Sequence, residues 1–256
     1  MDSEAGGDLD RLGEDLVLLS LADDGRIVNR KRLDFGLMGS ELVRLAAGGR
    51  VTIESNRVVV QDRAPCGDAE LDAALASLAG TRRGARPKAW VGHPRPGICD
   101  AYLDRLATAG AVRPERVERL GIFPVTRWRV ADPARRASAR ARLDEVALSD
   151  APVSTAQAAY AGLAHAVGLP ALLYRGWDNR HVRKRLERIA KGEWAAAAVS
   201  AASKDATAAA SQAAISAAQQ AAVAAAVDAA TAAAVQAAVG AAQQVAADGG
   251  GAHGHH

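Results

Sequence analysis

A helix that ends at glycine and continues directly into a two-stranded hairpin is encoded twice in this chain. In the first copy, which spans 41–60, the helix stops at Gly48 and two short strands flank a turn at Ser55-Asn56. In the second copy, which spans 102–130, the helix stops at Gly110 and the hairpin is predicted at 117–130. Glycine ends a helix readily because it adopts the left-handed backbone at little cost. The arrangement predicts a helical protein whose strands are confined to hairpins.

Helical periodicity and capping residues predict most of the other elements. Asp68 can cap a helix whose apolar positions recur every three to four residues, and Asp132 precedes a proline that suits the first turn of a helix. A short strand is expected at 26–29, and Trp90 is expected to pack on the core from a short helix. The longer helices are predicted at 14–21, 33–47, 71–78, 98–109, 133–148, 153–167 and 179–190.

The expected fold is mainly α-helical: a single compact helical domain with peripheral β-hairpins, followed by an Ala-rich helical or disordered tail. Residues 1–8 read as a flexible leader, 9–202 as the domain, and 203–256 as a low-complexity tail composed mostly of alanine. A chain of 256 residues is long enough for a sizeable core, and one domain is expected.

The charge of the chain is distributed unevenly. Residues 1–80 contain 9 Lys/Arg and 15 Asp/Glu, whereas residues 81–140 contain 14 Lys/Arg and 5 Asp/Glu. The basic block coincides with the second helix–hairpin unit. A local excess of this size favours an anionic partner, either lipid headgroups or nucleic acid. The alternative is a solvated basic face on an arginine-rich protein.

Sequence patterns of catalysis and metal binding are missing. Cys66 and Cys99 have no metal-ligand spacing, and His93, His165 and His181 lie in three separate segments. We therefore expect neither an enzyme nor a protein that needs a cofactor or metal. The acidic start of the chain does not resemble a signal peptide, and we find no spanning segment. A cytoplasmic protein with at most peripheral membrane contact is expected.

The tip of the second hairpin is apolar and surrounded by arginine. Its apolar residues would insert into a membrane surface, and Trp128 suits such an interface; alternatively, the same side chains pack on the protein's own core. If the strand is regular, Phe123, Val125 and Arg127 share one face, and Ile122 and Trp128 the other. The candidate inserting residues are Ile122, Phe123, Pro124, Val125 and Trp128, with Arg116, Arg119, Arg127 and Arg129 around them.

A helix, a glycine turn and a basic hairpin are also typical of a winged-helix protein that binds nucleic acid. In that reading the helix at 98–109 would enter the major groove. This helix carries Asp100 and Asp104 but only one arginine, Arg105, which equips it poorly for contact with phosphates or base edges. Nucleic acid is therefore the less favoured partner.

Six segments, taken in order, resemble the Golgi phosphoprotein 3 family, in particular its bacterial, actinobacterial-type members: 14–21, 33–51, 64–72, 106–112, 120–127 and 191–194. The resemblance covers about residues 9–202. It implies a cytosolic, peripheral, mainly helical protein that binds phosphatidylinositol 4-phosphate in its eukaryotic relatives. There, one hairpin enters the membrane and assists self-association, and the protein acts as an adaptor for membrane enzymes.

The lipid pocket of the eukaryotic relatives does not carry over residue by residue. A pocket tryptophan and arginine correspond to Asn29 and Met38, and two further arginines fall near Pro96 and Cys99. A specific inositol-lipid site is thus expected to be absent or rebuilt. The prediction is binding to the anionic phospholipid surface at the inner face of the membrane, with self-association. Charge alone nominates the anion contacts as Arg30, Lys31, Arg32, Arg95, Arg127 and Arg129.

Overall fold

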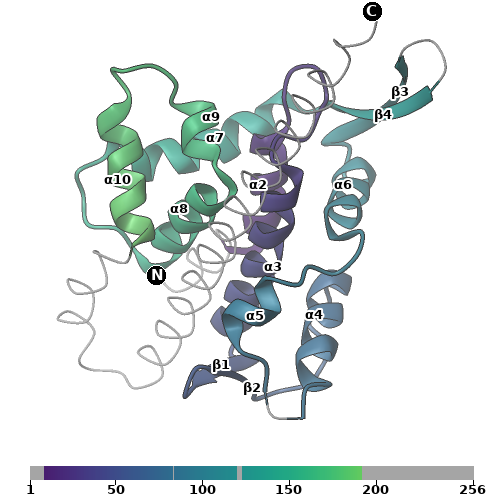
Figure 1. Ribbon diagram of the computed structural model, residues 1–256, viewed down its shortest axis with the longest axis vertical. Helices are drawn as coiled ribbons and strands as arrows, with labels where there is room; N and C mark the ends of the chain where they lie inside the picture. Colours follow the sequence, from purple (N-terminus) through teal and green to yellow (C-terminus); the bar gives the residue numbers. More distant parts are fainter. Residues whose placement is uncertain (1–8, 83, 120–122, 192–256) are drawn as a thin grey trace, which may run out of the picture.

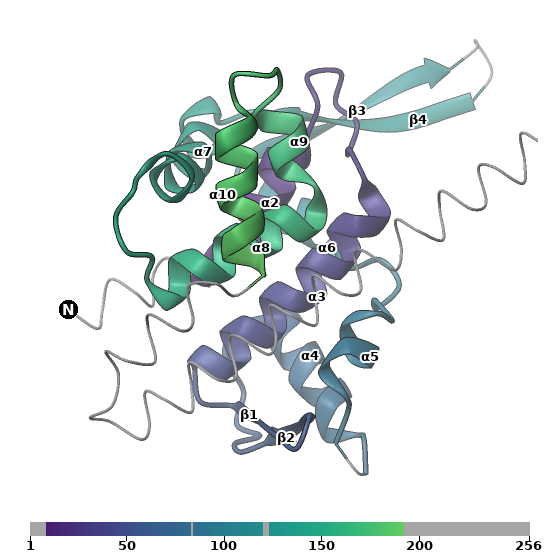
Figure 2. The same ribbon diagram turned by 60° about the vertical axis from the view of Figure 1, so that its left-hand side comes forward.

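The computed structural model describes residues 9–82, 84–119 and 123–191, and these form a helical body from which one hairpin projects (Figure 1). The second view shows α3 (Arg30–Ala47) crossing the middle of the body, with helices packed on both sides (Figure 2). The mainly helical fold class is therefore confirmed. The other helices are α2 (Leu12–Ser20), α4 (Ala69–Ala79), α5 (Pro87–Val91), α6 (Ile98–Thr108), α7 (Pro133–Leu148), α8 (Thr155–Val167), α9 (Leu169–Leu173) and α10 (Arg180–Ala190).

The core is built around α2, α3 and α8. Every residue of α2 is buried, and α3 is buried almost continuously from Phe35 to Ala46. Helices with so little exposed surface must be enclosed by other elements, and here α4, α5 and α6 lie along one part of α3 while α8 lies along another. Trp90 and Val91 pack into this core from α5, as the sequence predicts.

Side-chain caps fix the starts of several helices. The Asp68 carboxylate accepts hydrogen bonds from the backbone N–H groups of Glu70 (3.0 Å) and Leu71 (3.3 Å) at the start of α4. The Asp132 carboxylate accepts one from Arg135 (3.0 Å) at the start of α7. Each carboxylate satisfies N–H groups that have no partner inside the helix. Both predicted caps are confirmed.

The first hairpin pairs β1 (Val51–Glu54) with β2 (Arg57–Val60), as predicted. Ser55 and Asn56 connect the strands with φ of 48° and 60°, the left-handed geometry that suits a two-residue hairpin turn. The strand expected at 26–29 is reduced to one bridge between Leu21 and Ile27.

Two further elements differ from the expectation. The second hairpin begins at Val112, whereas the sequence places its start at 117, because the strand continues through Pro114 at positions opposite Trp128 to Val130. The five-residue helix α9 was not predicted, because a segment this short gives no clear periodicity.

Acidic residues of the buried helix α2 are paired with arginines from distant parts of the chain. Arg105 of α6 donates to Glu14 (2.6 Å) and to Asp68 (2.7 Å). Arg142 of α7 binds Asp15 through two nitrogens, at 2.9 Å and 2.7 Å. A carboxylate that is removed from water needs such a partner, so these pairs fix α2 against α6 and α7.

None of the helices within the described ranges is long and apolar enough to cross a membrane.

Candidate interaction site

The second hairpin consists of β3 (Val112–Arg119) and β4 (Phe123–Val130), and it extends away from the body beyond the end of α6 (Figures 1 and 2). Its antiparallel register is regular from the Val112–Val130 pair at the base to the Arg119–Phe123 pair. Because one residue faces one residue throughout, side chains two positions apart share a face, as the sequence analysis assumed.

Hydrogen bonds hold the base of this hairpin to the body. The Ala111 carbonyl accepts from the backbone N–H groups of Ala131 (2.9 Å) and Asp132 (3.1 Å). On the outer side of β4, the Trp128 N–H donates to the Gly25 carbonyl in the loop between α2 and α3 (2.9 Å). The inner half of the hairpin is therefore part of the rigid body, and the outer half extends beyond it.

Trp128 packs on the core of the protein. It is half-buried against the main apolar cluster, together with Val130 on the same face of β4. The sequence analysis grouped Trp128 with the inserting tip, but the structure places it near the base, opposite Pro114. For this residue the inward-packing alternative is the one observed.

The remaining residues of the predicted tip are only partly described. Val125 is half-buried, and Ile122 lies outside the described residues. Phe123 and Pro124 belong to β4 by their backbone, and their side chains lie outside the described part of the structure. Their expected role in insertion stays a prediction.

The arginines of the hairpin differ in their surroundings. Arg129 donates to Glu115 on the neighbouring strand (2.6 Å) and to the Asp23 carbonyl (2.6 Å), and the hydrogen bond and charge of Arg129 lower the pKa of Glu115. Arg127 is half-buried on the same face of β4, whereas Arg116 is exposed. Arg129 thus contributes to the structure of the hairpin base, while Arg116 faces solvent.

The basic residues at the start of α3 point in different directions. Arg30 forms an ion pair with Asp100 of α6 (2.5 Å), and this pair lies at the surface. Lys31 is exposed, and Arg32 is half-buried. Among these three residues, Lys31 is therefore the most accessible to a partner, whereas Arg30 takes part in the contact between α3 and α6.

Arg95 is enclosed by carboxylates. Its guanidinium donates to both oxygens of Glu41 (2.6 Å and 2.7 Å) and to Glu70 (2.9 Å). The Glu41 side chain is 0% exposed, and burial raises its pKa to about 7 although Arg95 opposes the shift. Arg95 therefore has a structural role, because it balances the charge of a buried acid. The sequence analysis had proposed it for lipid contact on the basis of its charge alone.

The four positions at which the resemblance places the eukaryotic lipid pocket differ in burial, since Met38 and Cys99 are buried whereas Asn29 and Pro96 are exposed. Met38 and Cys99 are in the core, and burial raises the pKa of the Cys99 thiol to about 12. Asp34 is half-buried beside Arg30 and Asp100, and burial raises its pKa. Arg30 is already paired with a carboxylate, and Asp34 adds a second one nearby. Such a group of charges is poorly suited to bind an inositol phosphate.

In the winged-helix alternative, α6 would enter the major groove of DNA, but its arginine is already paired with carboxylates. Arg105 of α6 is bonded to Glu14 and Asp68, and Asp100 and Asp104 are exposed on the same helix. A phosphate backbone would therefore meet mainly negative charge on α6.

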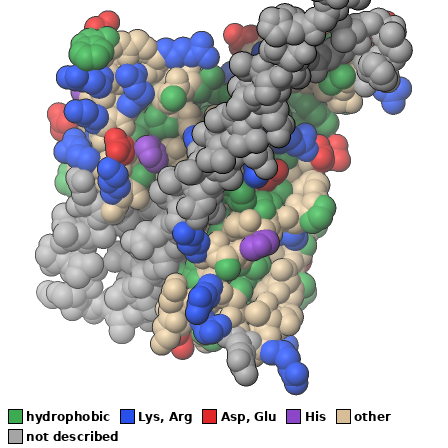
Figure 3. Space-filling model, viewed as in Figure 1, with side chains coloured by type: hydrophobic (Ala, Val, Ile, Leu, Met, Phe, Trp, Pro, Cys, Tyr) green, Lys and Arg blue, Asp and Glu red, His purple; other side chains and the backbone are tan. Residues whose placement is uncertain are grey.

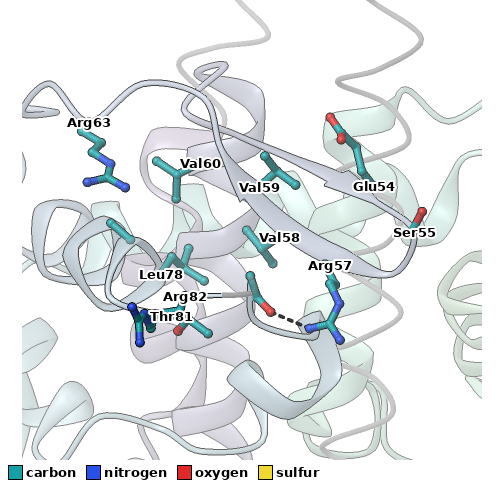
Figure 4. Close-up of a pocket in the computed structure, with 12 residues that line it drawn as sticks. Glu54, Ser55, Arg57, Val58, Val59, Val60, Arg63, Leu78, Thr81 and Arg82 are labelled. Carbon is teal, nitrogen blue, oxygen red and sulfur yellow. Dashed lines mark hydrogen bonds between the residues drawn. The ribbon is translucent and has the colours of Figure 1, made fainter.

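A surface hollow of about 500 Å³ lies between β2, the end of α4 and the loop after it. Figure 4 shows apolar side chains of β2 and Leu78 between Arg63 and Thr81, and Arg57 donating to the Gly84 carbonyl (3.0 Å). The hollow lies at the end of the molecule that carries β1 and β2, away from the second hairpin (Figure 1). The sequence analysis did not predict it.

The family model described as Golgi phosphoprotein 3 (GPP34) matches residues 12–206. No curated protein matches the chain. The matched range includes every described helix and both hairpins.

Proposed function

The chain belongs to the Golgi phosphoprotein 3 family, and we therefore propose that it binds membrane surfaces as a peripheral protein, with the β3–β4 hairpin as the contact. The family is generally one of Golgi phosphoinositide-binding proteins, and this supports lipid binding as the function. On this proposal the protein acts by binding at the cytoplasmic side of a bilayer, and it serves as an adaptor rather than as an enzyme.

One observation carries the proposal: a hairpin with the apolar sequence Ile122-Phe123-Pro124-Val125 extends from a body to which its base is hydrogen-bonded. An apolar tip in water gains nothing, whereas its insertion at the headgroup boundary removes apolar surface from water. Lys and Arg near an anionic surface each add about 1 kcal/mol of attraction. Lys31, Arg116 and Arg127 are the basic residues that support this contact best.

We further propose that the ligand is anionic lipid in general rather than phosphatidylinositol 4-phosphate in a dedicated pocket. Arg30 and Arg95 are bound by carboxylates of the protein itself, and the resemblance places pocket arginines of the eukaryotic relatives at Met38 and near Cys99, both of which are buried. Loose attraction to charge discriminates poorly between headgroups, because it depends on surface potential rather than on directed hydrogen bonds.

Vesicle sedimentation tests the proposal. The full chain should sediment with vesicles of phosphatidylcholine and phosphatidylserine, and not with phosphatidylcholine alone. Phe123→Ser should lower the bound fraction because it removes apolar surface from the tip. Val59→Ser makes the same kind of change on the other hairpin, where Val59 is half-buried, and should leave binding unchanged.

Two results would contradict the proposal. Failure of the full chain to bind acidic vesicles would end the lipid hypothesis, and salt-sensitive retention on duplex DNA would then favour the nucleic-acid alternative. Much stronger binding to phosphatidylinositol 4-phosphate than to phosphatidylserine at equal surface charge would contradict the absence of a dedicated pocket.

A further inference from the structure

Trp177 is the most exposed large apolar side chain in the described part of the structure, at 75% of its full accessible surface. It lies in the loop between α9 and α10, and the guanidinium of Arg180 stacks over its ring, 4.5 Å from the centroid. An indole this exposed adds little to the stability of the core, and its apolar ring is available to a partner.

The loop that carries Trp177 is held in place by several hydrogen bonds. Arg183 donates to the Gly176 carbonyl (2.8 Å) and to the Tyr174 carbonyl, and the Asn179 side chain donates to the Arg175 carbonyl (2.8 Å). The backbone on both sides of the tryptophan is therefore fixed. The indole is presented to solvent by an ordered loop rather than by a frayed end.

Helix α10 adds a basic face beside this tryptophan. Its apolar residues Val182, Leu186 and Ile189 are buried against the body. The opposite face is exposed and carries Arg180, His181, Lys184 and Arg188, and the acid on this face, Glu187, is paired with Lys191 (2.7 Å). Lys and Arg side chains gather over the region of α10 on the face shown in Figure 3, with Asp178 as the acidic residue of the preceding loop.

The Trp177 loop and the β3–β4 hairpin lie toward the same end of the molecule. In Figures 1 and 2, which differ by a rotation about the vertical axis, the α9–α10 connection, the loop between α2 and α3, and the outer ends of β3 and β4 are all near the top. The intervening loop carries acidic groups that are compensated, since Asp24 pairs with Arg26 (2.5 Å) and Asp23 lies 3.6 Å from Arg136.

From this arrangement we infer a second lipid-binding site, formed by Trp177 and the first turns of α10, that contacts the same anionic bilayer as the hairpin. The inference rests on the proposed function and adds a second point of contact to it. The indole has an apolar ring and one N–H donor, which is the combination favoured at the bilayer interface, and the neighbouring cations match anionic headgroups. Two contacts on one rigid body strengthen each other because the second forms intramolecularly.

The direction of α10 gives this site a testable gradient. The helix begins at the end that carries Trp177 and runs back along the body. With a rise of 1.5 Å per residue, Lys184 lies about 6 Å and Arg188 about 12 Å along the axis from Arg180. Attraction to a charged surface decays over a Debye length of about 8–10 Å at ordinary salt concentrations. Lys184 should therefore contribute more than Arg188.

The test measures partition of the full chain onto vesicles of phosphatidylcholine and phosphatidylserine. Trp177→Ala should lower the partition coefficient at least fivefold, and Lys184→Gln should lower it about threefold. Arg188→Gln should change it less than twofold. Leu148→Ala is the matched control, because Leu148 is also exposed (61%) but lies at the end of α7. Brominated lipids should quench wild-type tryptophan fluorescence more than that of Trp177→Phe.

The outcomes separate this inference from the proposed function. If the wild type binds vesicles, Phe123→Ser weakens binding and Trp177→Ala does not, the second site is wrong while the hairpin proposal stands. If the wild type does not bind vesicles at all, both are wrong. Equal losses for Lys184→Gln and Arg188→Gln, with Trp177→Ala at the wild-type level, would indicate that the vesicle surface is attracted by the whole basic face of α10 and not by a site at Trp177, and would also overturn the inference.

Discussion

Gly25 is the residue of the loop between α2 and α3 that accepts a backbone hydrogen bond from the hairpin. Its φ of 79° is in the left-handed region, and an added Cβ would lie 3.0 Å from the Arg127 Cβ and 3.1 Å from the Trp128 backbone nitrogen and oxygen. Both the conformation and the space therefore require glycine. We expect Gly25→Ala to lower the free energy of unfolding by about 2–3 kcal/mol, measured by urea denaturation.

Gly49→Ala is the control for the conformational part of this effect. Gly49 has a similar φ of 68°, but nothing lies within 4 Å of the position of its Cβ. We expect a loss of about 1 kcal/mol, which is the cost of the left-handed backbone alone. Equal losses for the two variants would contradict the close contact between Gly25 and β4.

Arg95 gives a prediction with a defined pH dependence. Arg95→Met leaves Glu41 buried without its main partner, and we expect a loss of about 3 kcal/mol at pH 8.5. At pH 6 the loss should be clearly smaller. With Arg95 present, burial raises the pKa of Glu41 from 4.5 to about 7. Because the Arg95 guanidinium opposes this shift, its removal should raise the pKa of Glu41 further. At pH 6 the carboxyl is therefore protonated in both folded proteins.

The sign of this effect follows from proton linkage. When the pKa of a carboxyl is higher in the folded than in the unfolded state, the free energy of unfolding of the protein falls as the pH rises from the unfolded pKa to the folded pKa. The reason is that the unfolded chain ionises more readily in this range. The variant should therefore lose additional stability above pH 7. Arg26→Met is the control, because the Arg26–Asp24 pair is exposed, and it should change stability little at either pH. A pH-independent loss for Arg95→Met would contradict the buried state of Glu41.

At the scale of helices and strands, Asp68 has two roles that a single substitution can separate. It caps α4, and it also pairs with Arg105 (2.7 Å) and with Arg44 (3.0 Å), whose side chain is only 7% exposed. Asp68→Asn keeps the cap but removes the charge. We expect it to destabilise the protein by about 3 kcal/mol, because two arginines lose a partner.

Asp132→Asn provides the matched comparison for the cap. Asp132 accepts a hydrogen bond at the start of α7, and asparagine caps about as well as aspartate. The expected loss is below about 0.5 kcal/mol, measured by thermal unfolding alongside Asp68→Asn. If the two variants were equally stable, the buried ion pairs of Asp68 would contribute nothing.

Local signals predicted most of these elements. The caps at Asp68 and Asp132 and the turn at Ser55-Asn56 depend on residues next to one another in the sequence, and each is found where it was expected. The surroundings of Arg95 and Trp128 depend on contacts between distant segments. Glu41 and Arg95 are 54 residues apart, and periodicity gives no information about such pairs.

The candidate site was predictable only in outline for the same reason. The second hairpin was predicted, but its longer first strand and the inward position of Trp128 follow from how β4 meets the loop at Gly25. Trp177 was missed altogether. A tryptophan directly before a helix with arginines on one face, as in 175–188, is the signal that could have identified it.

At the scale of the whole molecule, a single apolar cluster joins residues from Leu9 to Ile189. The family match ends at 206, seventeen residues after this cluster. We expect a chain shortened to residues 9–206 to unfold in one cooperative transition with a Tm within a few degrees of the full chain, measured by circular dichroism. A broad or strongly lowered transition would show that the core depends on residues outside this range.

The bond between Trp128 and Gly25 also has a mechanical consequence. Hydrogen bonds at Gly25 and Ala111, together with the cap at Asp132, join the base of the hairpin to the loop between α2 and α3 and to the start of α7, so a force on the outer strands should reach these helices. We therefore expect the hairpin to keep a fixed orientation relative to the helical body. If the outer end of the hairpin binds a membrane surface, the fold should therefore determine the distance and the tilt of the helical body relative to that surface.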